Sequence, residues 1–156
     1  MIAELLSTGD EIRTGALIDA NSAYIAERVE MSGIPVVRHT TVGDDLKELV
    51  TVLQEIGSRA DIAVVTGGLG PTEDDLTAES AAEAAGVVRD LDSVALKMIE
   101  HFFEKFGRPM STSNRKQAYL PRGAIRLDNR IGTAPGFLLK IGRCRFFFLP
   151  GVPIEM

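Results

Sequence analysis

The stretch Asp61-Ile-Ala-Val-Val-Thr-Gly-Gly-Leu-Gly-Pro-Thr-Glu-Asp-Asp-Leu-Thr77 joins a strand-like apolar run to a glycine-rich loop and an acidic cluster. Residues 62–65 are apolar and largely β-branched, as is typical of a buried strand. Gly67, Gly68 and Gly70 follow, and glycine lets backbone N–H groups approach an anion because no Cβ intervenes. A helix that begins soon afterwards adds the partial positive charge of its N-terminus. The stretch therefore predicts a phosphate-binding loop at the end of a strand.

Three carboxylates, Glu73, Asp74 and Asp75, come directly after these glycines. Carboxylates repel phosphate, so their place beside such a loop predicts a hard divalent cation between the two. Acidic residues also suit an ordinary helix start, but a helix start does not require three glycines. The loop has neither the Lys-Ser or Lys-Thr of a P-loop nor the G-x-G-x-x-G spacing. We therefore expect neither a nucleotide triphosphatase nor a nicotinamide dehydrogenase.

Three successive strand–loop–helix units predict an α/β fold with a largely parallel sheet. Apolar strands are expected at 2–6, 36–42 and 62–65, followed by helices that end near Met31, begin at Leu46, and run from Leu76 to near Gly86. A further helix, capped by Asp92 or Ser93, carries a largely aromatic stripe that is typical of core, formed by Ala95, Ile99, Phe102, Phe103 and Phe106. Two late strands, 136–141 and 143–149, predict a hairpin and hence an antiparallel edge.

Acidic residues follow each of the three parallel strands, in the loops Gly9-Asp10-Glu11, Gly43-Asp44-Asp45 and Gly67–Asp75. Ligands of open α/β sheets bind outside the carboxyl ends of the strands, so these loops are expected to converge. The candidate metal ligands are Asp10, Asp44, Asp74 and Asp75, and the last two are also the candidate catalytic residues. Gly-Asp-Asp at 43–45 is equally typical of a helix N-terminus.

The composition matches one globular domain of 156 residues, with a net charge of -5 and no run of Lys and Arg. This argues against a nucleic-acid or anionic-membrane surface. No stretch approaches the ~20 apolar residues of a membrane span, and the start lacks a secretory signal, so we expect a cytoplasmic protein. Cys144 is the only cysteine, which excludes an intrachain disulfide and a cysteine-rich zinc site, and its run Arg-Cys-Arg-Phe-Phe-Phe-Leu predicts a small strand residue. The compact cationic group Asn114-Arg-Lys-Gln117 is suited to contact a phosphate, or to form a solvated helix face.

Seven motifs in order along nearly the whole chain resemble the N-terminal domain of the competence-damage-inducible protein A (CinA) family. CinA domains belong to the molybdopterin-binding, molybdenum-cofactor-biosynthesis superfamily, whose shared mark is Thr-Gly-Gly-x-Gly followed by Asp. The motifs are Gly9-Asp-Glu11, Asn21, Thr41-Val-Gly-Asp44, Thr66-Gly-Gly-Leu-Gly-Pro-Thr72 with Asp74-Asp-Leu-Thr77, Asn114-Arg-Lys-Gln-Ala118, Gly132-Thr-Ala-Pro-Gly136, and Leu149-Pro-Gly-Val-Pro153 with Glu155-Met156.

The resemblance implies a three-layer αβα sandwich with a mostly parallel sheet and an antiparallel edge. For the superfamily it implies molybdopterin binding. For the CinA branch it implies a pyrophosphatase that uses Mg²⁺, Mn²⁺ or Co²⁺ to hydrolyse ADP-ribose to AMP and ribose 5-phosphate. The alternatives are a module that binds molybdopterin or a nucleotide without cleaving it, and a regulatory or scaffold domain with an idle pocket. The implied residues are Thr66, Gly67, Gly68, Gly70, Asn21, Thr77, Asn114 and Lys116 for the phosphorylated ligand, with Asp10, Asp44, Asp74 and Asp75 for the metal.

Many CinA proteins carry a second domain that deamidates nicotinamide mononucleotide, and no part of it is recognised in residues 1–156. That activity is therefore not expected here. We expect a single domain over 1–156 that is truncated at its C-terminal end. A site so open to solvent also leads us to expect a homo-oligomer, with a small-molecule phosphate as the ligand.

Overall fold

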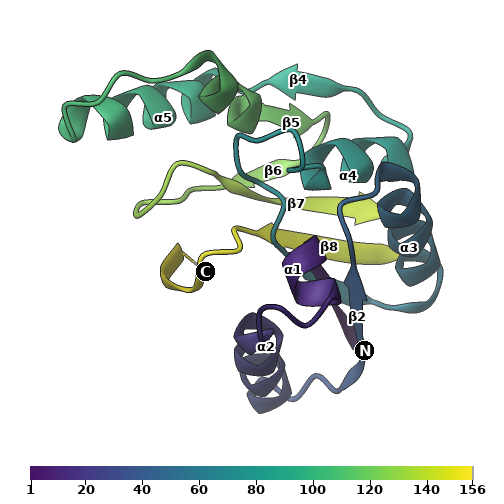
Figure 1. Cartoon of the computed structure of the whole chain (residues 1–156). Helices are drawn as coiled ribbons and strands as arrows, with labels where there is room; N and C mark the ends of the chain where they lie inside the picture. The colour runs from purple at the N-terminus through teal and green to yellow at the C-terminus, as the bar shows by residue number, and fades with distance from the viewer. Residues whose placement is uncertain (156) are drawn as a thin grey trace.

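A six-stranded sheet, in the order β2-β1-β3-β8-β7-β6, forms the middle layer of the molecule (Figure 1). The computed structural model describes residues 1–155, so Met156 of the last motif lies outside the described residues. Four strands are parallel, and β7 and β6 continue the sheet antiparallel to their neighbours. A second small sheet pairs β4 with β5. The strands are β1 (Ala3–Thr8), β2 (Val36–Val42), β3 (Ile62–Thr66), β4 (Arg89–Leu91), β5 (Tyr119–Pro121), β6 (Ile125–Leu127), β7 (Gly136–Ile141) and β8 (Cys144–Leu149).

Five α-helices and two 3₁₀ helices connect the strands in the described part of the chain. Asp19, Asp45 and Asp92 cap α2, α3 and α5 by accepting backbone N–H groups of the first turn. Gly86 ends α4 in the left-handed conformation. The helices are α1 (Asp10–Arg13), α2 (Ala20–Met31), α3 (Leu46–Arg59), α4 (Thr77–Ala85), α5 (Ser93–Lys105), η1 (Thr112–Ala118) and η2 (Pro153–Glu155).

The two faces of the sheet bury different side chains, as the two-residue repeat of a strand requires. In β3, Ala63 and Val65 join the larger core cluster under α3 and α4, whereas Val64 packs with Ile25 of α2 on the other face. The rings of Phe137 and Phe148 stack in the larger cluster with centroids 4.4 Å apart. This arrangement confirms the predicted three-layer fold with a mostly parallel sheet and an antiparallel edge.

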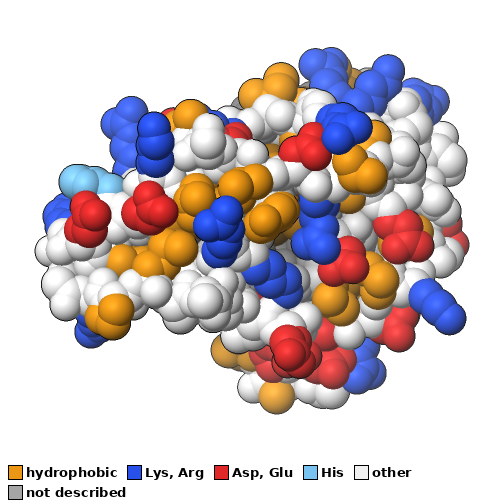
Figure 2. Space-filling view, turned by 90° about the horizontal axis from the view of Figure 1, so that it is seen from above, with side chains coloured by type: hydrophobic (Ala, Val, Ile, Leu, Met, Phe, Trp, Pro, Cys, Tyr) orange, Lys and Arg blue, Asp and Glu red, His pale blue; other side chains and the backbone are white. Residues whose placement is uncertain are grey.

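The differences from the sequence predictions are confined to short or peripheral elements. The helix α1 and the strands β4, β5 and β6 were not predicted, since three or four residues are too few to show a periodicity. The stripe on α5 is only partly core: Ile99 is buried, but Phe106 is 57% exposed. The reason is that α5 packs mainly on η1, beyond the edge of the main sheet (Figure 1). On the face that carries α5, basic and acidic side chains are mixed with hydrophobic side chains (Figure 2).

Cys144 lies in a strand, β8, as predicted; it is also buried, and burial raises the pKa of its thiol to about 12. A thiol of this kind stays protonated and unreactive at neutral pH. Within residues 1–155, no helix is long and apolar enough to cross a bilayer.

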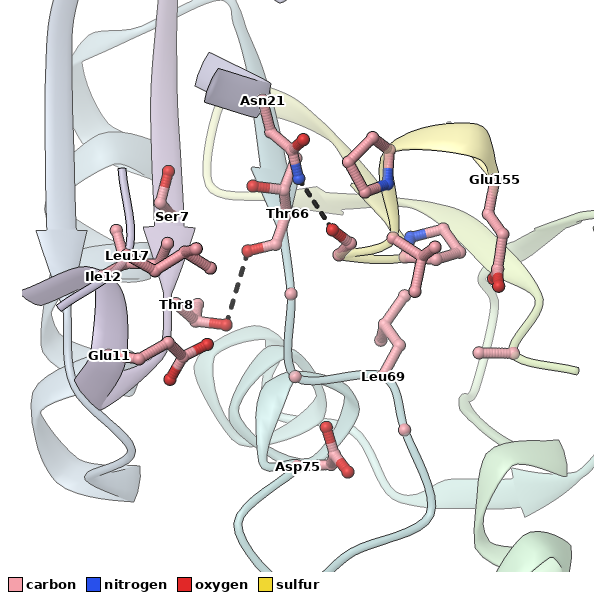
Figure 3. A pocket seen from close by; sticks show the side chains of 18 of the residues that line it. Ser7, Thr8, Glu11, Ile12, Leu17, Asn21, Thr66, Leu69, Asp75 and Glu155 are labelled. Carbon is pink, nitrogen blue, oxygen red and sulfur yellow. Dashed lines mark hydrogen bonds between the residues drawn. The ribbon is translucent and has the colours of Figure 1, made fainter. Parts of the chain in front are cut away.

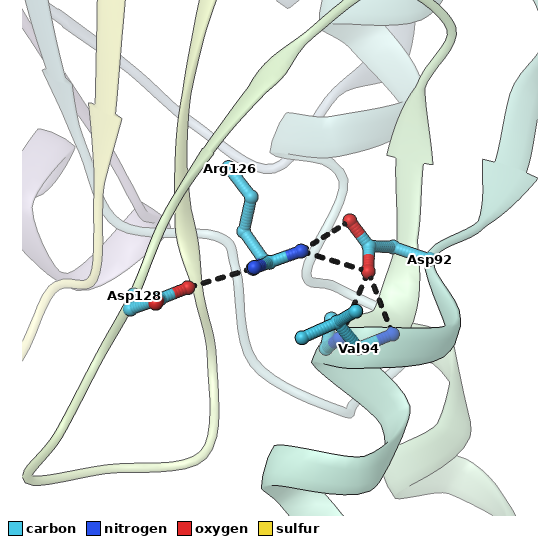
Figure 4. Close-up of polar contacts among 5 residues, drawn as sticks. Asp92, Val94, Arg126 and Asp128 are labelled. Atoms are coloured by element: carbon cyan, nitrogen blue, oxygen red, sulfur yellow. Dashed lines mark hydrogen bonds and ion pairs between the residues drawn. The ribbon is translucent and has the colours of Figure 1, made fainter.

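Arg126 of β6 ties the N-terminus of α5 to the main sheet (Figure 4). Its Nη1 donates to both carboxylate oxygens of Asp92, at 3.0 and 2.9 Å, and its Nε donates to Asp128 at 2.7 Å. Burial raises the pKa of Asp92, but hydrogen bonds from the Ala95 N–H group and Arg126 outweigh burial and hold the pKa below its usual value. The ionised form of Asp92 therefore stabilises the fold.

We predict that Asp92→Ala lowers the free energy of unfolding by roughly 1–2 kcal/mol at pH 7, because it removes a helix cap and a charged hydrogen-bond partner. The control Asp128→Ala, which removes an exposed partner of the same arginine, should cost less than about 0.5 kcal/mol. Since the pKa of Asp92 is lowered on folding, its contribution is complete above about pH 4 and is lost as the pH falls through the folded pKa. Urea denaturation of wild type and Asp92→Ala at pH 7 and pH 2.5 measures the free energy of unfolding. A stability difference between the two proteins that is as large at pH 2.5 as at pH 7 would contradict the prediction.

Candidate functional site

A cavity of about 630 Å³ opens at the carboxyl ends of β1 and β3 (Figure 3). One wall comes from the end of β1 and the segment that runs through α1 to the start of α2. The opposite wall comes from the glycine loop, η1 and the chain that follows β8. The lining residues used below are Thr8, Glu11, Asp19, Asn21, Thr66, Gly67, Gly68, Leu69, Gly70, Asp75, Gln117, Gly151 and Glu155.

The glycine loop is held against β1 so closely that Gly67 and Gly68 have no room for a side chain. Both have positive φ angles, 97° and 65°. A Cβ on Gly67 would lie 2.7 Å from the Thr8 carbonyl oxygen, and one on Gly68 would clash with the Thr77 hydroxyl. Thr77 donates in turn to the Gly67 carbonyl at 2.8 Å. The first turn of α4 and the end of β1 therefore fix the path of the loop.

Three consecutive backbone donors of this loop are available to a ligand. The Gly67 N–H donates to the Leu149 carbonyl at 3.2 Å, which joins the loop to β8. Among residues 1–155, the N–H groups of Gly68, Leu69 and Gly70 donate to no protein acceptor. Successive N–H groups in a left-handed turn form the concave nest that binds anions.

Asp75 closes the far end of the glycine loop. Its Oδ2 accepts from the backbone N–H of Thr72 at 2.8 Å and from the Thr72 hydroxyl at 2.6 Å. The same carboxylate packs so tightly on Gly70 that a Cβ there would lie 2.5 Å from Oδ2. The carboxylate is thus held in one orientation at the cavity (Figure 3).

The chain after β8 forms the outer wall and is pinned to the rest of the site. Asn21 donates to the Gly151 carbonyl at 2.8 Å (Figure 3), and Asn129 donates to Glu155 at 2.8 Å. A Cβ on Gly151 would lie 3.2 Å from the Gly67 Cα, so the outer wall also rests on the glycine loop. Asn21, predicted to contact the ligand, lines the cavity and holds this wall in place.

The described lining is acidic: it holds Glu11, Asp19, Asp75 and Glu155, and no Lys or Arg. Burial raises the pKa of Asp19, but hydrogen bonds from Ser7 and Ser22 outweigh burial and keep the pKa below its usual value. Glu11 and Asp75 lie on opposite walls (Figure 3). An anionic ligand would have to meet these carboxylates through a cation.

The other predicted metal ligands, Asp10, Asp44 and Asp74, lie outside the lining. Asp44 accepts from the Asp10 N–H at 3.2 Å, and Asp10 accepts from Arg13 at 3.0 Å. Burial, together with the charges of Asp10, Glu11 and Asp74, raises the pKa of Asp44, so these carboxylates share one acidic region. No three His, Cys, Asp or Glu side chains of the described chain lie close enough to form a ready-made metal site.

The three remaining predicted residues support the site from outside the lining. Thr77 fixes the glycine loop, and Lys116 donates to the Thr72 carbonyl. Asn114 accepts from the N–H and hydroxyl of Ser111 and so forms the capping box of η1. The structure thus brings together six predicted residues at the cavity: Asn21, Thr66, Gly67, Gly68, Gly70 and Asp75.

Sequence reasoning did not select Glu11, Gln117 or Glu155, although all three line the cavity. Each stands inside one of the quoted motifs. The sequence shows these motifs, but it does not show which residue of each motif lines the cavity, because that depends on the backbone conformation of the loop.

We predict that Gly68→Ala destabilises the chain far more than Gly86→Ala. The two glycines have nearly the same φ, 65° and 69°, but a Cβ on Gly86 meets nothing within 4 Å. Gly86→Ala should therefore cost only the left-handed strain of about 1–2 kcal/mol, and Gly68→Ala roughly 1–3 kcal/mol more from the clash with Thr77. Urea denaturation compares the two variants; equal losses would contradict the tight packing of the loop.

Comparison with curated proteins finds close relatives over the full chain. A CinA-like protein of Desulfosudis oleivorans is 50% identical over 156 residues, which is 100% of this chain and 38% of that protein. A CinA-like protein of Anaeromyxobacter is 49% identical over 152 residues, which is 97% of this chain and 37% of that protein. The chain therefore spans less than two fifths of the length of the curated relatives it matches.

Solved structures share the fold. The CinA protein of Thermoplasma acidophilum superimposes with a TM-score of 0.90 at 35% identity, covering 99% of this chain and 90% of that one. The molybdopterin biosynthesis enzyme MoaB of Thermus thermophilus gives a TM-score of 0.63 at 18% identity, over 99% and 84%, which shows a common fold alone. The family model described as "Probable molybdopterin binding domain" matches residues 4–156. The chain belongs to this molybdopterin-binding domain family, and within it to the group of CinA-like proteins.

Proposed function

We propose that this domain binds a phosphorylated, ring-bearing small molecule at the glycine loop with a divalent cation, and hydrolyses ADP-ribose to AMP and ribose 5-phosphate. One observation carries the proposal. The cavity combines three N–H donors without a protein acceptor, at Gly68, Leu69 and Gly70, with a described lining that holds four carboxylates and no Lys or Arg. Backbone donors favour phosphate and the carboxylates oppose it, so a cation reconciles the two.

The carboxylates of the cavity fit such a cation. Mg²⁺ is usually held by one or two carboxylates, several waters and the phosphate oxygens of the substrate. Asp75 supplies one such carboxylate, because Thr72 binds only its Oδ2 and its Oδ1 has no hydrogen-bond partner among residues 1–155. When bound, a divalent cation would neutralise the pyrophosphate charge and lower the pKa of a bound water. Asp10, Asp44 and Asp74 would draw cations to the region without lining the cavity.

Hydrolysis requires a base that takes a proton from water while the water oxygen attacks one phosphorus atom and the P–O–P bond breaks. Glu11 is the candidate base, because within residues 1–155 its carboxylate has no hydrogen-bond or ion-pair partner and stays accessible. Asp75 is less suited, since Thr72 already occupies one of its oxygens twice. The N–H groups of the glycine loop would bind the phosphate charge as the bond breaks.

A second candidate function is molybdopterin binding without hydrolysis. The description of the matching family model favours it, and a pterin phosphate needs the same glycine loop. In this case, the carboxylates and the cation would contribute to binding of the ligand and would take no part in a reaction.

We predict that the chain releases AMP from ADP-ribose with Mg²⁺, Mn²⁺ or Co²⁺, and that EDTA abolishes the reaction. Glu11→Gln should lower kcat about 100-fold or more, as expected for loss of a general base. Chromatography of the nucleotide products measures both effects.

Two neighbours of Asp75 serve as matched controls for Asp75→Asn, which should lower activity strongly. Glu73→Gln and Asp74→Asn alter exposed carboxylates of the same cluster that do not line the cavity, and they should keep most of the activity. No AMP with any of the three metals, while ADP-ribose still binds, would favour the binding module. Full activity in both Glu11→Gln and Asp75→Asn would overturn the assignment of the site.

A further inference from the structure

Gln117 is the buried polar side chain of the cavity whose hydrogen bonding is incomplete. It lies in η1 and is only 6% exposed. Its Nε2 donates to the Leu69 carbonyl at 3.4 Å, whereas its Oε1 is buried with no partner among the described residues. Buried polar atoms in native proteins are nearly always paired, so an unpaired acceptor beside a cavity calls for a donor from outside the chain.

The direction of this amide follows from its neighbour. Because the Leu69 carbonyl is an acceptor, it needs the NH₂ end of Gln117, and this leaves the oxygen end unpaired. An unprotonated phosphate oxygen, such as one bound to a divalent cation, cannot fill that position, since it too is an acceptor. The missing partner must carry an O–H or N–H group.

Gln117 also lies next to the phosphate loop. It lines the 630 Å³ cavity of the site (the main cavity below) together with Gly68, Leu69 and Gly70, and the same three residues and Gln117 also line a much smaller cavity of about 10 Å³. The smaller cavity is at the lower limit for one water molecule. The main cavity is large enough for a ligand whose phosphate rests on the loop.

We propose that Gln117 is a specificity-determining residue whose Oε1 accepts a hydrogen bond from a neutral O–H or N–H group of the ligand, close to its phosphate. This inference rests on the proposed phosphate site. The donor is either a sugar hydroxyl or a ring N–H or amino group. In both cases, Gln117 selects an organic phosphate over inorganic phosphate or pyrophosphate.

The test is calorimetric titration of the chain with Mg²⁺ and four probes: pyrophosphate, ribose 5-phosphate, AMP and α,β-methylene ADP-ribose, whose P–CH₂–P bridge cannot be hydrolysed. Gln117→Met keeps the length of the side chain and removes its hydrogen bonding. We expect the Kd of α,β-methylene ADP-ribose to rise about tenfold, while the Kd of pyrophosphate stays within twofold. A rise for ribose 5-phosphate identifies the hydroxyl as donor; a rise for AMP but not for ribose 5-phosphate identifies the ring.

Equal weakening of all four probes would overturn the proposal, because it would mean that Gln117 only supports the glycine loop through Leu69. No weakening of any probe would also overturn it and would assign Oε1 to a bound water. If the wild-type chain binds none of the probes, the phosphate site itself is wrong and this inference falls with it.

A ligand-side test needs no variant and covers the case in which Gln117→Met does not fold. Wild-type protein is titrated with 2′-deoxy-AMP, 3′-deoxy-AMP and the purine riboside monophosphate that lacks the 6-amino group. One of these should bind about tenfold more weakly than AMP, since it lacks the donor that Oε1 requires. Equal affinity for all four nucleotides would exclude a nucleotide donor at Gln117.

Discussion

The close packing of Gly67 and Gly68 against Thr8 and Thr77 is the contact on which the site depends. It joins the end of β1, the end of β3 and the start of α4 within a space that excludes any side chain at either glycine. The Gly67 N–H adds the end of β8 through Leu149, and Gly151 rests on Gly67 from the outer wall. Because β1, β3 and β8 belong to the sheet, these contacts fix the path of the loop and so reduce the entropy that would be lost by ordering it on binding.

The second constraint is one of charge. A nest of N–H groups attracts phosphate, yet the charged side chains that line the cavity are acidic, and Lys116, which was predicted to contact the phosphate, donates to the Thr72 carbonyl. On the proposed function, this charge distribution would select the form in which phosphate binds. A bare phosphate would be repelled, a phosphate with a divalent cation would not, and an organic phosphate with a neutral donor would also give Gln117 Oε1 a partner.

Much of this fold follows from local signals in the sequence. The β-branched run of β2, the glycine stop of α4 and the capping aspartates of α2, α3 and α5 each act within a few residues, and these elements occur where the patterns predict them. The short strands β4 to β6 depend on tertiary pairing, so no local pattern marks them.

The site is less predictable for a physical reason. Both Asp74 and Asp75 stand beside the glycines in sequence, but the turn that binds Asp75 to Thr72 brings only Asp75 to the cavity, while Glu11 reaches it from the first turn of α1. The most direct test of the account is the change in the backbone amide NMR signals of Gly68, Leu69 and Gly70 on addition of the non-hydrolysable analogue α,β-methylene ADP-ribose with Mg²⁺. The account predicts large shifts at these three residues that disappear with EDTA. Shifts that are independent of metal, or confined to residues away from the glycine loop, would contradict it.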